Sequence, residues 1–153
     1  MFTIDASVHV NALNPTETGS QESQLFLKKI SRRPWLVFSP TLLLVEVAAA
    51  IARAFDDTER GLTMAQAIRG LPGQTWVPLD EALADESARL ASEYRLRGAD
   101  AVYAAIARRY GTTLITWDRQ QLVRLQPAVS ILTPDKALAQ LNTRENDVQE
   151  LEH

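Results

Sequence analysis

The chain has 153 residues, with 19 acidic and 16 basic side chains, a net charge of −3 and no cysteine. This length suits one domain with one core, and the lack of cysteine excludes disulfides and thiolate metal sites. The negative net charge argues against a strongly basic nucleic-acid binder, but if four of the 19 acids were metal ligands, the other 15 would be outnumbered by the 16 basic residues. RNA binding is therefore not excluded.

The two ends of the chain bear on targeting and on the extent of the domain. The N-terminal segment MFTIDAS lacks the basic region and apolar stretch of a secretory signal, and the longest apolar run is too short to span a bilayer. We therefore expect a soluble, cytoplasmic protein with no membrane contact. Residues 151–153 (LEH) are interpreted as the start of a vector-encoded histidine tag, and residues 142–153 as a polar, loosely ordered tail behind a domain of residues 1–141.

Five short runs are rich in β-forming residues, and helical periodicity lies between them. The runs are residues 1–4, 35–39, 75–79, 113–117 and 129–133. Apolar residues recur at helical spacing within residues 20–30 and 81–97. This alternation predicts an α/β fold with a central, mainly parallel five-stranded sheet that helices cover on both faces.

Two further helices are predicted from their starting residues. The segment SPTLLLVEV offers Ser39 as an N-cap and Pro40 at the first helical position, and TPDKALAQL repeats this pattern with Thr133 and Pro134.

Four acids lie beside apolar segments rather than on polar faces. Asp5 directly follows the first strand, and Asp118 lies just past the run TLIT. Asp100 lies in the first turn of an apolar helix, and Glu46 interrupts the apolar run of residues 42–52. An unpaired buried charge usually neutralises, pairs or binds a cation.

Each acid also has a structural interpretation. Asp5 and Asp100 could be N-caps, Asp118 could open a turn, and Glu46 could form an ion pair with Arg53 or another basic residue. Taken together, however, the four acids would converge at the carboxyl edge of the sheet, where ligands of such sheets bind. Oxygen ligands suit Mg²⁺ or Mn²⁺, which could promote the hydrolysis of a phosphodiester.

The sequence resembles the PIN domain family over roughly residues 2–135. The matching motifs are FTIDAS, LLLVEVAAAIAR, GADAVYAAIARRYGTTLIT and TWDRQQL, in that order. The resemblance implies a three-layer α/β/α sandwich and an RNA-cutting nuclease. It assigns Mg²⁺ or Mn²⁺ binding to Asp5, Glu46, Asp100 and Asp118, and supporting hydroxyl roles to Ser7 and Thr116.

One departure from the family pattern follows Asp118. Many relatives carry another Asp and then an aromatic residue there, whereas this chain has Gln120, Gln121 and Leu122. The four-acid core is intact, and a fifth acidic ligand stays open.

The small size resembles that of VapC-type toxins of toxin–antitoxin pairs, which implies a protein antitoxin and a homodimer. Residues 52–70 could form the helical pair that such partners grip, or an ordinary amphipathic helix that closes the core. The alternative function is an RNA- or protein-binding module of the same fold with weak or no nuclease activity.

Other candidate residues have mainly structural interpretations. We expect His9 on the surface or in a cap, and Trp117 packed at a strand end rather than stacked on a base. Six arginines lie near the acidic motifs and could contact phosphates: Arg95, Arg97, Arg108, Arg109, Arg119 and Arg124.

Overall fold

A central sheet runs through the computed structural model, which describes residues 1–33 and 35–151. Its described strands are β1 (Phe2–Ile4), β2 (Val37–Pro40), β3 (Gln74–Val77), β4 (Thr113–Ile115) and β5 (Ile131–Leu132). Their order is β3-β2-β1-β4-β5, and each neighbouring pair is parallel. The predicted five-stranded parallel sheet is confirmed.

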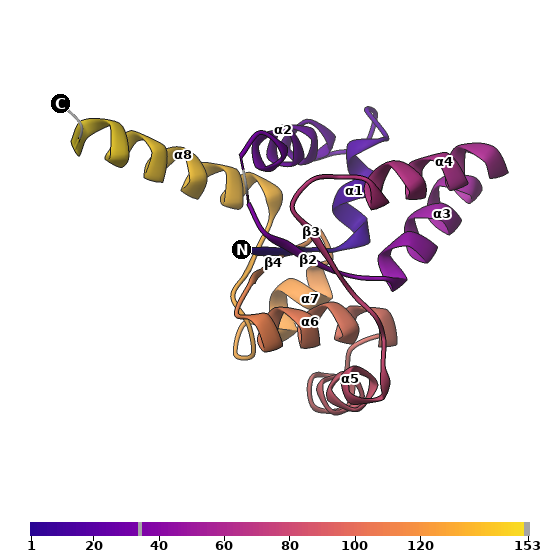
Figure 1. The fold of residues 1–153 in the computed structure, drawn as a ribbon. Helices are drawn as coiled ribbons and strands as arrows, with labels where there is room; N and C mark the ends of the chain where they lie inside the picture. The colour runs from indigo at the N-terminus through magenta and orange to yellow at the C-terminus, as the bar shows by residue number, and fades with distance from the viewer. Residues whose placement is uncertain (34, 152–153) are drawn as a thin grey trace.

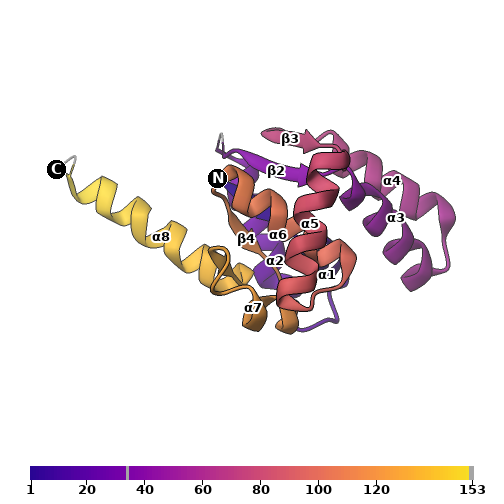
Figure 2. The same cartoon turned by 90° about the horizontal axis from the view of Figure 1, so that it is seen from below.

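Helices cover both faces of this sheet. They are α1 (Ala6–Ala12), α2 (Ser20–Ser31), α3 (Leu42–Phe55), α4 (Thr58–Arg69), α5 (Glu81–Tyr94), α6 (Gly98–Tyr110), α7 (Arg119–Arg124) and α8 (Pro134–Leu151). Figure 1 shows α1, α2 and α8 on one side of the strands and α5, α6 and α7 on the other. The pair α3 and α4 lies beside the end of the strands opposite the N-terminus (Figures 1 and 2). The three-layer α/β/α arrangement is therefore confirmed.

The strands alternate their side chains between two apolar clusters, as a pleated backbone requires. Phe2 and Ile4 of β1 belong to a cluster with α1, α2 and the start of α8. Leu114 of β4 belongs to the larger cluster, which includes Leu43 and Val47 of α3 and most of the buried face of α6. The central strands are thus buried on both faces, which makes their ends a rigid platform for side chains.

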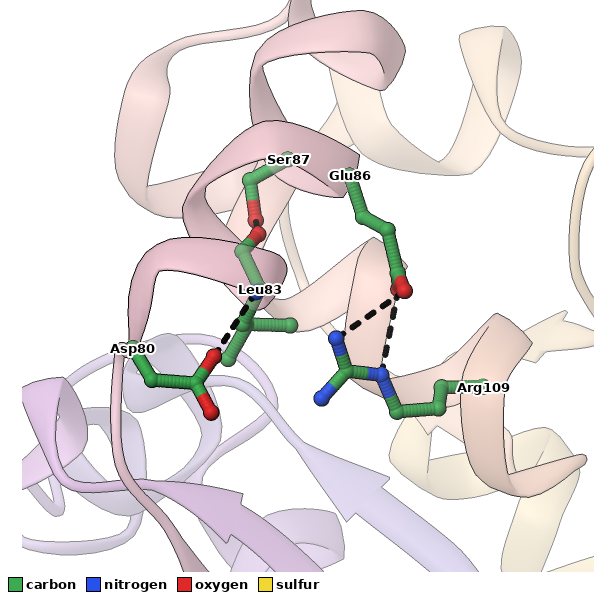
Figure 3. Close-up of polar contacts among 5 residues, drawn as sticks. All are labelled: Asp80, Leu83, Glu86, Ser87 and Arg109. Atoms are coloured by element: carbon green, nitrogen blue, oxygen red, sulfur yellow. Dashed lines mark hydrogen bonds and ion pairs between the residues drawn. The ribbon is translucent and has the colours of Figure 1, made fainter.

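Polar contacts connect α5 to α6 (Figure 3). The Asp80 side chain caps α5 by accepting from the Leu83 N–H at 2.8 Å. Arg109 of α6 donates two hydrogen bonds to Glu86 of α5, at 3.2 Å from Nε and 2.9 Å from Nη2. This partly exposed pair orients the two helices but contributes little stability, since exposed ion pairs are screened by water.

The predicted start of α3 is wrong. Pro40 is the last residue of β2, where it pairs with Val77, and α3 begins at Leu42. The Ser39 hydroxyl donates to the Gln74 side chain at 2.8 Å, so it is not free to cap a helix. Proline lacks only its backbone N–H, so at the last position of β2 it removes at most one hydrogen bond of the ladder, and pairing with β3 extends β2 through this position. The other predicted start is correct, because α8 begins at Pro134.

The expected loose tail is helical in the described part of the chain. α8 continues to Leu151, and Figures 1 and 2 show its second half extending away from the rest of the molecule. Its first half is held by the buried residues Ala137 and Leu141, and Lys29 of α2 donates a hydrogen bond to Asn142. A helix that is already nucleated propagates readily through favourable residues. Residues 152–153 lie outside the described residues.

None of the described helices combines the length and the apolar content that a membrane span requires.

Candidate active site

The candidate site lies at the carboxyl edge of the two central strands. β1 and β4 are paired with Ile4 opposite Ile115, and the Asp5 N–H donates to the Ile115 carbonyl at 2.9 Å. The residues that follow both strands therefore emerge side by side. This register brings Asp5 next to the segment that contains Thr116 and Asp118.

Asp5 is the most buried of the four acids, with 6% of its surface exposed. It is the N-cap of α1, and its Oδ2 accepts from the Ser7 N–H at 2.8 Å. Its Oδ1 accepts from Nε2 of Gln121 at 3.2 Å. Burial raises the pKa of Asp5, and the Asp118 charge adds to this rise, while hydrogen bonds from Ser7 and Gln121 oppose it.

Asp100 faces Asp5 from the first turn of α6. The N-cap of α6 is Arg97, so the capping interpretation of Asp100 is wrong. Its Oδ1 accepts from Nε2 of Gln121 at 2.8 Å. Burial raises the pKa of Asp100, the Asp5 charge raises it further, and the hydrogen bond from Gln121 opposes both.

Glu46 reaches the site from the middle of α3. The Tyr103 hydroxyl of α6 donates to its Oε2 at 2.5 Å. Burial raises the pKa of Glu46, the Tyr103 hydrogen bond lowers it, and the charges of Asp5 and Asp100 raise it. Within the described residues no ion pair joins Glu46 to Arg53, so the suggested ion pair between these two residues is wrong.

Asp118 combines a structural role with a place in the cluster. It is the N-cap of α7, and its Oδ1 accepts from the Gln121 N–H at 2.9 Å. Its charge acts on both Asp5 and Asp100. Electrostatic effects thus connect Asp5 with each of the other three acids, and the Gln121 amide joins Asp5 to Asp100. The convergence of all four acids on one metal site stays a prediction.

Ser7 and Thr116 hold the segment after β4 in place. The Thr116 hydroxyl accepts from the Asp118 N–H at 3.0 Å, and the Ser7 hydroxyl accepts from the Trp117 N–H at 3.2 Å. The two hydroxyl oxygens lie 3.4 Å apart. Both hydroxyls thus contact the backbone that carries Asp118, and a hydrogen bond from the Ser7 side chain also lowers the pKa of Asp5.

A family model described as the PIN domain matches residues 2–126. The chain belongs to the PIN domain family. Its fold is similar to that of FitAcB from Neisseria gonorrhoeae, with a TM-score of 0.66 and 19% identity over 88% of this chain and 98% of that chain. It is also similar to VapBC2 from Rickettsia felis bound to a promoter DNA fragment, with a TM-score of 0.65 and 12% identity over 86% and 97% of the two chains.

A third similar structure is VapC20 from Mycobacterium tuberculosis, described as a sarcin-ricin loop cleaving toxin. The TM-score is 0.63, with 17% identity over 77% of this chain and 90% of that chain. At these identities the three structures support the fold alone. A comparison with curated protein sequences gave no match.

The acids of this PIN domain supply the oxygen donors that a hard cation prefers. Nevertheless, no three His, Cys, Asp or Glu side chains in the described ranges are arranged to hold a metal ion directly. The Gln121 amide hydrogen-bonds both Asp5 and Asp100. These carboxylate oxygens are of the kind that suits Mg²⁺ or Mn²⁺, and the Gln121 amide lies between two of the carboxylates.

Two residues of the site were not identified from the sequence, although each left a signal. Tyr103 lies three residues after Asp100, which places both on one face of α6. Gln121 lies three residues after Asp118, the spacing of a capping box. Neither spacing indicates that the side chain would reach an acid on a different element.

His9 differs from expectation and Trp117 agrees with it. His9 is buried, and burial lowers its pKa to about 4, so its expected surface or capping role is wrong. The Trp117 indole N–H donates to the Ser23 hydroxyl at 2.7 Å, and its ring lies against Gly19. These contacts support packing rather than base stacking.

Two of the six arginines already have protein partners. Arg109 donates to Glu86, and Arg124 donates to the Arg95 carbonyl. A phosphate contact by either would have to compete with these hydrogen bonds.

Proposed function

We propose that this PIN domain is a metal-dependent endoribonuclease that hydrolyses RNA phosphodiester bonds. The observation that carries the proposal is the buried Asp5, which interacts with three other acids at the carboxyl edge of the sheet. Such a cluster is electrostatically unfavourable without a counter-charge. A cluster of this kind at the ligand-binding edge of a parallel sheet supports a role in function.

Four residues would hold Mg²⁺ or Mn²⁺, namely Asp5, Glu46, Asp100 and Asp118. The cation would supply charge stabilisation at the scissile phosphate and lower the pKa of water. The chain positions the acids: the Ser7 N–H orients Asp5, and Tyr103 orients Glu46. Thr116 fixes the backbone of Asp118.

Cleavage of a panel of RNAs tests the proposal, with Mg²⁺ or Mn²⁺ present and with EDTA. We expect cleavage that EDTA and Asp5→Asn each abolish. Asp57→Asn is a matched control, because Asp57 is also a helix N-cap and lies exposed at the start of α4. Asparagine caps a helix as well as aspartate does. Cleavage by the Asp5→Asn protein in EDTA would contradict the mechanism.

A binding module of the same fold, with weak or no nuclease activity, is the second candidate. The Gln121 amide hydrogen-bonded to both Asp5 and Asp100 favours it, because an amide can satisfy these acids without a metal. Calorimetric titration with Mn²⁺ separates the two candidates. A nuclease centre should bind Mn²⁺ with measurable heat that Asp5→Asn removes, whereas a pure binding module need not.

We further propose that the protein is the toxin of a type II toxin–antitoxin pair, with a protein antitoxin and a homodimeric state. The similar structures include VapBC2, and one described as a toxin–antitoxin complex from Klebsiella pneumoniae. An apolar pocket of about 380 Å³ between α1, α2 and α4 could accept a partner side chain. Co-purification with the product of a short neighbouring reading frame, and the mass of the free protein in solution, test both parts.

A further inference from the structure

Gln121 occupies a central place among the acids without being one. Its side chain is fully buried, with 0% of the residue exposed. The Nε2 amide nitrogen donates to Oδ1 of Asp5 at 3.2 Å and to Oδ1 of Asp100 at 2.8 Å. One amide group therefore uses its two hydrogens to connect the two carboxylates.

The orientation of this amide follows from its neighbours. An ionised carboxylate accepts hydrogen bonds and cannot donate them. The NH₂ group therefore has to face Asp5 and Asp100. Turning the amide over would place Oε1 against two carboxylate oxygens, which repel it. The two acids thus select the donor end of Gln121.

The other end of the same amide is unsatisfied. Oε1 of Gln121 is buried and has no hydrogen-bond partner among the described residues. Leaving a buried acceptor unpaired is unfavourable. Gln121 is therefore not placed to satisfy its own polar atoms, and its position is explained by the acids that it contacts.

Local hydrogen bonds leave Gln121 free for this role. In a capping box, the side chain at this position would reach back to the Asp118 N–H. Here the Thr116 hydroxyl accepts from that N–H instead. The backbone N–H of Gln121 still donates to Asp118, so the start of α7 is fixed while the side chain extends to Asp5 and Asp100.

We propose that Gln121 is a latch on the acid cluster: its amide occupies the position between Asp5 and Asp100 and must leave for a divalent cation to bind there. This inference rests on the proposed function, since it takes the acid cluster as the cation site. Both oxygens of Asp5 already accept hydrogen bonds, one from Ser7 and one from Gln121. A cation bound between Asp5 and Asp100 would need the space that the Nε2 hydrogens of Gln121 occupy.

The latch has two consequences that oppose each other. It stabilises the metal-free fold by giving two crowded carboxylates a common donor. It also weakens cation binding, because the cation has to displace hydrogen bonds to charged groups. A residue that only packs in the core would produce the first consequence without the second.

Gln121→Met tests the latch, because methionine has a similar size and no donor. We measure the Mn²⁺ dissociation constant by calorimetry and the thermal midpoint in EDTA. We expect the midpoint to fall and Mn²⁺ to bind at least about tenfold more tightly, because the variant removes two competing hydrogen bonds to charged groups and the loss of one alone would give about tenfold. Gln120→Met, at the exposed neighbouring position on α7, should change neither value.

The outcomes separate the latch from the proposed function. Unchanged or weaker Mn²⁺ binding by Gln121→Met, with normal binding by the wild type, overturns the latch alone. If none of the three proteins (the wild type, Gln121→Met and Gln121→Glu) binds Mn²⁺, the cation site is overturned and the latch with it.

A measurement on the wild type covers the case in which Gln121→Met does not fold. The Gln121 side-chain NH₂ signals can be followed by NMR during titration with Mg²⁺, which is diamagnetic. We expect slow hydrogen exchange in EDTA and fast exchange at saturation, as the amide leaves the cluster. Exchange that stays slow at saturating Mg²⁺ would overturn the latch.

Discussion

The Tyr103 hydroxyl donates to Oε2 of Glu46 at 2.5 Å, although the two residues are 57 positions apart in the chain. Tyr103 is fully buried on α6, and Glu46 interrupts the apolar face of α3. Burial, followed by the nearby charges of Asp5 and Glu46, raises the pKa of Tyr103 well above its usual range, so it remains a donor. The contact therefore orients Glu46 toward Asp5 and Asp100.

Removal of this donor should affect both stability and activity. Tyr103→Phe leaves the carboxylate of Glu46 without this partner, and we expect a loss of about 1–2 kcal/mol in the free energy of unfolding. RNA cleavage should also slow, because Glu46 is no longer held in one orientation. Urea denaturation and cleavage rates measure the two effects. Tyr94→Phe, on the half-buried end of α5, is the control, and an equal effect of both variants would contradict the orienting role.

Neutralising one acid should stabilise the metal-free protein. Asp100→Asn removes a negative charge that faces Asp5 and Asp118, while the asparagine Oδ1 can still accept from Gln121. We expect a higher thermal midpoint in EDTA at pH 7 and a smaller increase when Mn²⁺ is added. A lower midpoint in EDTA would show that charge repulsion does not dominate the cluster. Asp57→Asn again controls for the chemical change.

The close packing of α3 on α4 depends on Gly61. A Cβ atom there would lie 2.5 Å from the backbone carbonyl oxygen of Ala48. This oxygen belongs to α3 and cannot move alone, so we expect Gly61→Ala to cost about 1–3 kcal/mol of stability. At Gly98 a Cβ would meet nothing within 4 Å, so Gly98→Ala should be neutral or slightly stabilising. Denaturant unfolding of the two variants checks this contrast in sign.

His9 should make the protein sensitive to acid. Burial lowers its pKa to about 4 from the ordinary value of 6.5, so the unfolded chain binds a proton more readily than the folded one. Stability is therefore fully present above pH 6.5 and is lost as the pH falls toward 4, by at most ~3 kcal/mol. Unfolding measured from pH 7 to pH 4 should show a shallower decline for His9→Leu. An equally steep decline would assign the acid sensitivity to other groups.

Much of the fold follows from local patterns in the sequence. All five predicted strands are present, and the alternation of strands and helices correctly predicts a parallel sheet covered on both faces. Local patterns fail where a tertiary contact competes with them. Pro40 is in a strand because β2 pairs with β3, although its sequence resembles a helix start. The end of α8 is helical because its buried first half has already formed the helix.

For the candidate site, too, the sequence determines one part and the tertiary structure the other. The sequence alone was sufficient to single out Asp5, Glu46, Asp100 and Asp118, because a charged residue beside an apolar run is visible without a structure. Only the tertiary structure decided which neutral groups contact these acids. Tyr103 and Gln121 reach their partners across different elements, and the direction of a buried side chain depends on how helices pack on the sheet rather than on adjacent residues. The sequence therefore proposes the acids as a set, while the hydrogen bonds that orient and connect them come from the tertiary structure alone.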